Sequence, residues 1–127
     1  MTSVITICDT CKRDDWAERA AKDGVELTDG EALATLVEAA ANGVAGVETR
    51  RHSCLMGCSH GCNVSLQAPG KLTYTLGKFE NTAEAAEGIV AYAALHAEST
   101  SGQVPFKQWP QAIKGHFITR IPPLPDA

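Results

Sequence analysis

Five cysteines fall in two groups along this 127-residue chain, and their placement constrains the fold more than any other feature. Cys8 and Cys11 form a C-x-x-C pair directly after a short β-branched run, while Cys54, Cys58 and Cys62 follow a second predicted strand. An odd number excludes complete pairing in disulfides within the chain. Clustered thiols of a cytosolic protein are more often metal ligands or redox-active pairs than structural disulfides. The two groups therefore predict a chemical site.

The segments around the cysteines predict a strand–helix–strand unit. Residues 4–7 are a nearly continuous apolar run, typical of a strand covered on both faces. A helix is expected after Thr28, which forms a capping box with Glu31, and it should end at Asn42. Residues 44–51 alternate as a second strand, and the helix is a crossover of suitable length for a parallel pair. We expect a βαβ unit.

The rest of the chain predicts a hairpin, a helix and a tail. Residues 63–68 and 71–76 alternate on either side of a Pro-Gly turn. The last helix should be capped by Asn81, with Glu84 three residues on, and run to Ala97. The polar segment 9–29 has no clear period, so a helix there stays undecided.

The predicted order is β-α-β-β-β-α, an α/β fold with one mixed sheet. Residues 1–127 are expected to form a single domain, with a core over 1–98 and a Pro-rich tail over 99–127 packed on it. Phe106 and Trp109 lie in this tail among lysines and an arginine. The tail either covers the core, the interpretation we favour, or docks an acidic partner.

The topology brings the cysteines together. The loops after two neighbouring parallel strands lie at the same end of a sheet, and such strands are ~4.8 Å apart. Cys8, Cys11, Cys54 and Cys58 are therefore expected to converge on one inorganic centre, and four thiolates are the ligand set of an iron–sulfur cluster. Cys62 is either a fifth, exchangeable ligand or a small buried residue.

Three alternatives use the same thiols. Four cysteines could hold a structural zinc ion, although zinc ribbons place both pairs within about 15–20 residues of each other. The C-x-x-C pair could be a thiol–disulfide oxidoreductase dithiol. The cysteines could also be unreactive buried residues. His52 and His60 flank the site and could replace a ligand. A lone histidine in a loop is more often solvated, or hydrogen-bonded to such a centre, than bound to the metal.

Charge and hydropathy exclude several classes of function. The formal net charge of -4 argues against nucleic-acid binding, which needs clustered Lys and Arg. No stretch approaches the ~20 apolar residues of a membrane helix, and the first residues lack the basic region and apolar core typical of a signal peptide, so we expect a cytoplasmic protein. The sequence shows no Ser/His/Asp set, phosphate-binding glycine loop or paired-carboxylate motif, so nothing in it indicates hydrolytic or nucleotide chemistry.

The loop from Cys54 to Ser59, Cys-Leu-Met-Gly-Cys-Ser, resembles the C-L-x-x-C loop of the thioredoxin-like [2Fe–2S] ferredoxins. Over nearly the full length the pattern is similar to DUF1636, a bacterial family described as predicted metal-binding proteins. The matching residues are the two cysteine groups, the segment Leu66-Gln67-Ala68-Pro69-Gly70-Lys71 and the end Ile121-Pro122-Pro123-Leu124.

The resemblance implies a thioredoxin-like fold and one [2Fe–2S] cluster held by Cys8, Cys11, Cys54 and Cys58. It implies an electron carrier that is not itself an enzyme and that exchanges electrons with a redox donor or acceptor protein. A second copy of the chain, forming a homodimer, is a further candidate partner. Some relatives are linked to cobalamin or cobalt metabolism, which is a hint about partners.

Overall fold

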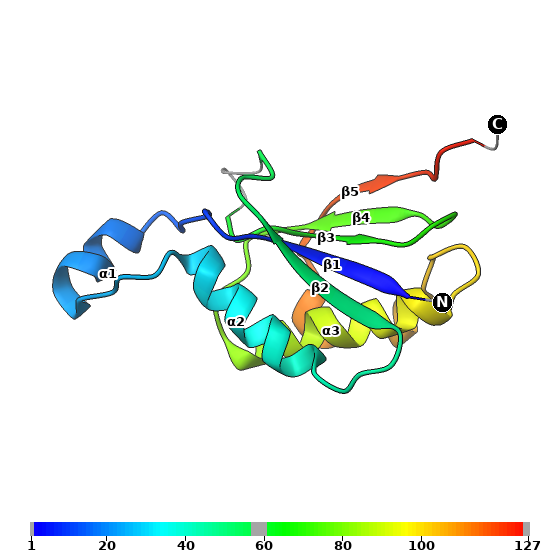
Figure 1. Ribbon diagram of the computed structural model, residues 1–127, viewed down its shortest axis with the longest axis horizontal. Coiled ribbons are helices and arrows are strands. Elements are labelled where there is room, and N and C mark those ends of the chain that lie inside the picture. Colours follow the sequence, from blue (N-terminus) through cyan, green and yellow to red (C-terminus); the bar gives the residue numbers. More distant parts are fainter. Residues whose placement is uncertain (1, 57–60, 126–127) are drawn as a thin grey trace.

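The computed structural model describes residues 2–56 and 61–125 of the chain (Figure 1). Within these residues, five strands and three helices follow one another as β1 (Ser3–Cys8), α1 (Trp16–Asp23), α2 (Asp29–Ala41), β2 (Val47–His52), β3 (Val64–Gln67), β4 (Thr73–Leu76), α3 (Ala83–Glu98) and β5 (Phe117–Ile121). Two short 3₁₀ turns, Phe106–Gln108 and Gln111–Ile113, lie between α3 and β5. The predicted mixed α/β fold is confirmed.

The strands form one open sheet in the order β2-β1-β3-β4-β5. β1 and β2 are parallel, as the βαβ prediction required, and the other neighbouring pairs are antiparallel. The β3–β4 connection is the predicted Pro-Gly turn, in which Lys71 N–H donates to Ala68 O at 3.2 Å and Gly70 has φ 71°. This arrangement is compatible with the thioredoxin-like fold that the resemblance implies.

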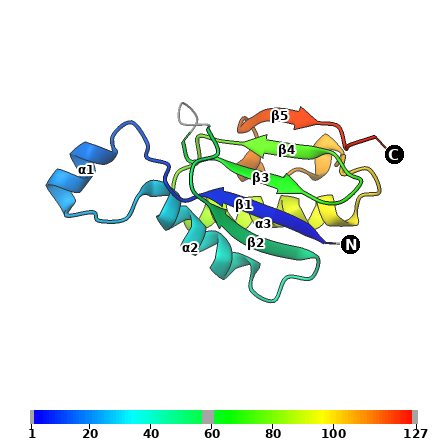
Figure 2. The ribbon, with the colours of Figure 1, turned by 45° about the horizontal axis from the view of Figure 1, so that its top comes forward.

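Helices α2 and α3 lie side by side against one face of the sheet (Figures 1 and 2). The core lies between them and the sheet, where Ile5, Ile7, Leu33, Leu66 and Ile89 are almost completely buried. The other face of the sheet is polar. On that face Thr6, paired with Arg50 of β2, is 2% exposed and accepts a hydrogen bond from Arg50 Nε at 2.6 Å. β1 is thus buried as predicted, but side chains of its neighbours rather than a second helix layer cover its outer face.

Both predicted helices form, and one cap differs from the prediction. The Thr28–Glu31 capping box is present at the start of α2. The N-cap of α3 is Thr82 and not Asn81, because Thr82 has the extended backbone of a cap and its side chain accepts the Ala85 N–H. No described helix is long and apolar enough to span a bilayer.

Two elements were not predicted. The undecided segment contains α1, which has no buried residue. The Pro-rich tail contains a fifth strand, β5, which pairs with β4 through Thr119 opposite Thr75. Val104 and Ile113 of the same tail are buried in the core. The prolines confine this strand to five residues but do not prevent it, because Pro110 and Pro122 lie outside the paired segment.

Candidate functional site

Cys8 and Cys11 lie where the two parallel strands end. Cys8 is the last residue of β1 and stands opposite His52, the last residue of β2. Asp9 N–H donates to His52 O at 3.2 Å, so the two loops leave the sheet together. Cys8 is 2% exposed and Cys11 is 4% exposed. The predicted position of the C-x-x-C pair, at the shared end of β1 and β2, is therefore confirmed.

The loop after β2 and the start of β3 supply hydrogen-bond donors to these thiols. Leu55 N–H donates to Cys8 Sγ at 3.4 Å, and Asn63 Nδ2 donates to Cys11 Sγ at 3.2 Å. Thr10 Oγ1 lies 3.6 Å from Cys8 Sγ. Amide donors aimed at sulfur stabilise thiolates. The loop that carries Cys54 thus lies against the C-x-x-C pair.

The two thiols have opposite electrostatic environments. Burial raises the pKa of the Cys11 thiol to about 12, with the adjacent Cys8 adding to the shift. For Cys8, burial acts to raise the pKa, but hydrogen bonds from Cys11, Leu55 and Thr10 outweigh it, so the pKa lies below its ordinary value. Cys8 is therefore the first of this pair to form a thiolate.

The remaining cysteines lie differently. Cys54 is exposed, has a left-handed backbone (φ 63°), and its Sγ points to Met56 Sδ at 3.7 Å. Cys62 is completely buried, and burial raises its pKa to about 12, with the charge of Asp29 contributing to the shift. Its thiol also lies within electrostatic reach of Cys8 and Cys11. Cys62 is thus buried like Cys8 and Cys11, and its role as a fifth ligand or a packing residue stays a prediction.

Cys58 and His60, together with Gly57, lie outside the described residues. Of the predicted four-cysteine convergence, the described residues show Cys8 and Cys11 close together and the Cys54 loop beside them, while Cys54 Sγ itself contacts Met56. His52 is exposed beside the pair. Within residues 2–56 and 61–125, no group of three or more His, Cys, Asp or Glu side chains is arranged to hold a metal ion.

The donor chemistry of this sheet end suits a thiophilic metal. Soft thiolates are the ligands preferred by zinc and by iron–sulfur clusters. Amide donors stand beside both buried sulfurs, and within the described part of the chain the buried Asp9 Oδ1 has no hydrogen-bond partner. Cys8 and Cys11 would supply two ligands to a bound group, and the loop would supply the others.

The N-terminus of α2 packs against the C-x-x-C loop and forms hydrogen bonds with its backbone. Gly30 N–H donates to Cys11 O at 2.9 Å, and Thr28 Oγ1 donates to Asp9 O at 2.6 Å. A Cβ atom at Gly30 would lie 2.0 Å from Cys8 O, so only glycine permits this approach. The capping box was predicted from the sequence, but its contact with the thiol loop was not.

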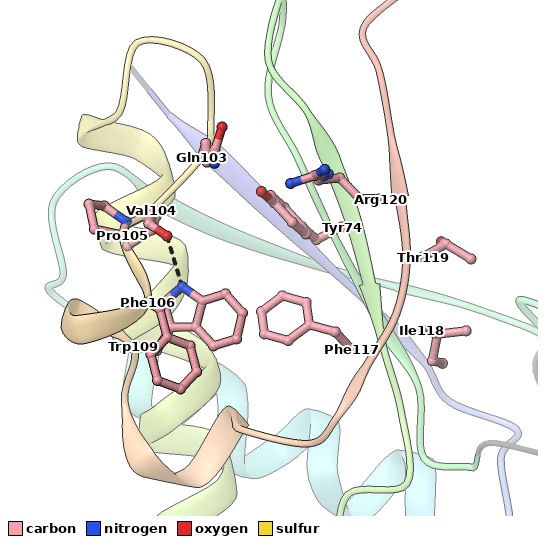
Figure 3. Close-up of a pocket in the computed structure, with 10 residues that line it drawn as sticks. All are labelled: Tyr74, Gln103, Val104, Pro105, Phe106, Trp109, Phe117, Ile118, Thr119 and Arg120. Atoms are coloured by element: carbon pink, nitrogen blue, oxygen red, sulfur yellow. Dashed lines mark hydrogen bonds between the residues drawn. The ribbon is translucent and has the colours of Figure 1, made fainter.

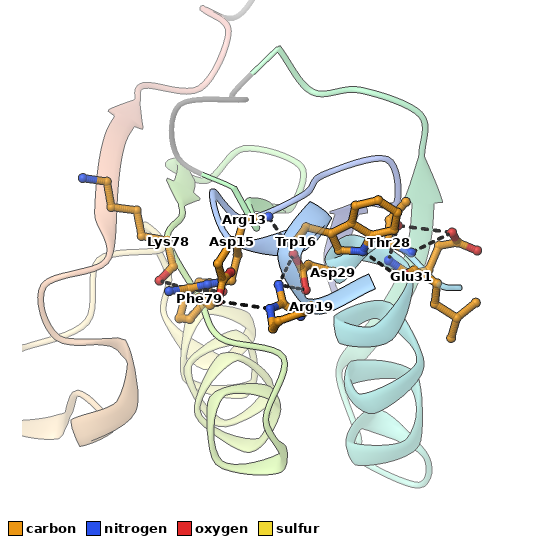
Figure 4. A network of polar contacts seen from close by, with 10 residues as sticks. Arg13, Asp15, Trp16, Arg19, Thr28, Asp29, Glu31, Lys78 and Phe79 are labelled. Atoms are coloured by element: carbon orange, nitrogen blue, oxygen red, sulfur yellow. Dashed lines mark hydrogen bonds and ion pairs between the residues drawn. The ribbon is translucent and has the colours of Figure 1, made fainter. Parts of the chain in front are cut away.

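A polar network fixes the chain downstream of the pair (Figure 4). Asp29 is 1% exposed, accepts the Arg13 N–H at 2.6 Å and binds Arg19 Nη2 through both carboxylate oxygens at 2.8 Å. Arg13 Nη1 donates to Phe79 O at 2.7 Å. Sequence reasoning missed Asp29 and Asn63 as site-supporting residues. The only sequence signal for Asp29 was its position as an acid in the first turn of a helix with a predicted capping box.

Fold and site together define a class: a small α/β protein with an open five-stranded mixed sheet and a cysteine-bearing loop pair at one end of it. A family model, described as "Protein of unknown function (DUF1636)", matches residues 5–123. The chain belongs to the DUF1636 family. Searches of curated proteins and of solved structures find no match.

Proposed function

We propose that this chain is a small electron-transfer protein that holds one [2Fe–2S] cluster through Cys8, Cys11, Cys54 and Cys58. The observation that supports this most is the contact between the two loops, in which Leu55 N–H donates to Cys8 Sγ at 3.4 Å. It places the residue after Cys54 against the first buried thiol. A bound cluster would supply one-electron chemistry.

The chain's own residues would set the properties of that centre. Cys8 and Cys11 are almost completely buried, which shields their side of the site from water. Leu55 N–H and Asn63 Nδ2 donate to the sulfurs and would stabilise their negative charge. On the other side, Cys54 is exposed and Met56 is 87% exposed. An electron donor or acceptor protein would dock on this side.

The proposed setting is the cytosol, with a redox protein as the partner and no enzymatic reaction of the chain's own. A link to cobalamin or cobalt metabolism rests on the family resemblance alone. The competing occupant of the same thiols is a zinc ion, which would make the chain a metal-stabilised interaction module.

Cysteine variants test the proposed ligand set. Anaerobically purified Cys8→Ser, Cys11→Ser, Cys54→Ser and Cys58→Ser should each lose or distort the visible absorption of the wild-type protein, because each removes a thiolate ligand. Cys62→Ser is the matched control, a buried cysteine that should retain the spectrum. Loss in Cys62→Ser with retention in Cys54→Ser would contradict the assignment.

A second candidate is a thiol–disulfide oxidoreductase that uses Cys8 and Cys11. The donors around Cys8 Sγ and the burial of Cys11 favour it. The Cys8 thiolate would attack a substrate disulfide and release one substrate thiolate, and Cys11 would then attack Cys8 Sγ of the mixed disulfide and release the second. The substrate leaves as two thiols, and the chain keeps a Cys8–Cys11 disulfide.

A disulfide-reduction assay, with dithiothreitol present to reduce the Cys8–Cys11 disulfide after each cycle, separates the two candidates. An oxidoreductase loses turnover in Cys8→Ser and Cys11→Ser but keeps it in Cys54→Ser and Cys58→Ser. A cluster protein shows no turnover in any variant. Wild-type turnover that survives in Cys54→Ser would replace the electron-transfer proposal with the oxidoreductase.

A further inference from the structure

A cavity of about 390 Å³ lies between β5 and the segment that follows α3, apart from the cysteine loops (Figure 3). Four aromatic side chains line it, together with Gln103 and Arg120. The aromatic residues are Tyr74, Phe106, Trp109 and Phe117. Its volume falls in the range of small-molecule sites, about 300–1,000 Å³.

The aromatic walls are held in place by their own contacts. Trp109 Nε1 donates to Val104 O at 2.8 Å, which fixes the indole ring. The Trp109 ring lies 4.6 Å from that of Phe117 and 4.9 Å from that of Phe106, measured between centroids. Phe106 nevertheless remains 63% exposed. Such fixed and accessible rings can take up a further flat ring at little entropic cost.

Arg120 gives the cavity a positive charge. It stands opposite the 4% exposed Tyr74 across the β4–β5 pair, and Figure 3 shows its guanidinium beside the hydroxyl end of that side chain. No carboxylate among residues 2–56 and 61–125 forms an ion pair with Arg120.

The surrounding sequence reinforces this charge. Residues 99–125 contain Lys107, Lys114 and Arg120 but no Asp or Glu, although the whole chain carries a net charge of -4. The Lys114 ammonium lies 4.8 Å from the centroid of the Phe106 ring. Arginine is suited to bidentate binding of a carboxylate. The cavity thus combines flat aromatic walls with the Arg120 guanidinium, which has no acid partner among the described residues.

We propose that this cavity binds a small planar aromatic carboxylate. Its ring would lie among Phe106, Trp109 and Phe117, and its carboxylate would pair with Arg120 next to the Tyr74 hydroxyl. None of the cysteines lines the cavity, so a test of this site does not depend on whether the chain holds the proposed cluster.

Binding of 2-naphthoate to the full-length protein tests this, with uncharged 2-naphthalenemethanol as the matched probe. Titration followed by amide and indole NMR signals should show saturable 2-naphthoate binding that shifts the Trp109 indole N–H. Arg120→Gln should weaken 2-naphthoate about tenfold or more and leave 2-naphthalenemethanol unchanged, since it removes a charge-assisted hydrogen bond. Arg120 is exposed, so the variant should fold normally.

Lys107→Gln is the control, because it removes a positive charge from an exposed residue of the same segment that does not line the cavity. It should leave the affinity for 2-naphthoate unchanged. Equal weakening by Lys107→Gln and Arg120→Gln would overturn the proposal in favour of non-specific charge attraction. The proposal would also be overturned if 2-naphthoate binding did not saturate. A wild-type dimer that Trp109→Ala converts to a monomer would overturn it as well, because this surface would then bind a second copy of the chain.

Discussion

Gly30 is the residue at which the main helix meets the thiol loop. Its N–H binds Cys11 O, and its missing side chain lets α2 approach the end of β1. A glycine in the first turn of a helix is otherwise unfavourable, because it loses more backbone entropy than alanine on folding. The close approach explains its presence here.

Gly30→Ala should therefore destabilise the protein even though alanine is the better helix former. A Cβ atom 2.0 Å from Cys8 O forces α2 away from the loop. We expect a loss of about 1–3 kcal/mol in the free energy of unfolding, measured with urea. A variant as stable as the wild type would show that α2 does not approach the loop this closely.

His96 is a buried residue that titrates differently in the folded and unfolded chain. It is 0% exposed; its Nε2 donates to Leu72 O at 2.7 Å, so Nδ1 accepts from Ser3 Oγ at 2.6 Å. Burial lowers its pKa below the ordinary 6.5, and the charge of Lys71 adds to that effect, while the hydrogen bond to Leu72 opposes it. The folded protein therefore holds this imidazole neutral at neutral pH.

Stability should fall as the pH drops below 6.5 because of this residue. Below pH 6.5 His96 is protonated in the unfolded chain but stays neutral in the folded chain, which favours unfolding. The contribution of His96 to the free energy of unfolding is therefore present at pH 7.5 and is lost as the pH falls towards the lower pKa of the folded state. Urea unfolding at pH 7.5 and 5.5 should show a smaller pH dependence for His96→Gln than for the wild type. His52→Gln, a change at an exposed histidine, should keep the wild-type dependence. Equal slopes for wild type and His96→Gln would contradict this account.

At the scale of elements, α1 differs from the other two helices. It buries no residue and is attached through side-chain contacts, mainly the Arg19–Asp29 ion pair and the hydrogen bond from Trp16 Nε1 to Leu27 O at 2.8 Å. Helices α2 and α3 instead bury apolar faces against the sheet. We infer that α1 opens more readily than the core.

Arg19→Ala should increase opening of α1 alone. Amide hydrogen exchange over residues 16–23 should accelerate roughly fivefold or more, because a charge-assisted contact to buried Asp29 is lost. Exchange in β1 and α3 should stay as in the wild type. Lys22→Ala, at an exposed position of the same helix, should leave exchange unchanged. Acceleration spread evenly over the sheet would show instead that α1 and the core open as one unit.

The same contrast explains which elements the sequence predicted. α2, the β3–β4 hairpin and α3 carry local signals, namely the Thr28 capping box, the Pro69-Gly70 turn and a face of small apolar residues. α1 is short and polar on average and buries none of its residues, so no apolar run marks it in the sequence. β5 exists because β4 offers it an edge to pair with, and that pairing is tertiary.

At the scale of the whole molecule, the topology places Cys8, Cys11 and the loop that begins at Cys54 at one end of the sheet. Two cysteine groups after neighbouring parallel strands were enough to predict that their loops meet, and Leu55 contacts Cys8 as such a meeting requires. The detailed arrangement was beyond the sequence, because the exposure of Cys54 and the donor role of Asn63 depend on loop conformation. Nor could sequence periodicity indicate the aromatic cavity, which joins the side chain of Tyr74 in β4 with side chains from two parts of the tail, residues 103–109 and β5.

The content of iron, acid-labile sulfide and zinc per chain, measured on anaerobically purified wild-type protein, tests the central proposal most directly. A [2Fe–2S] centre predicts about two iron and two sulfide per chain and a red-brown protein. Zinc without sulfide, or a colourless protein with five free thiols and no metal, would contradict the electron-transfer function.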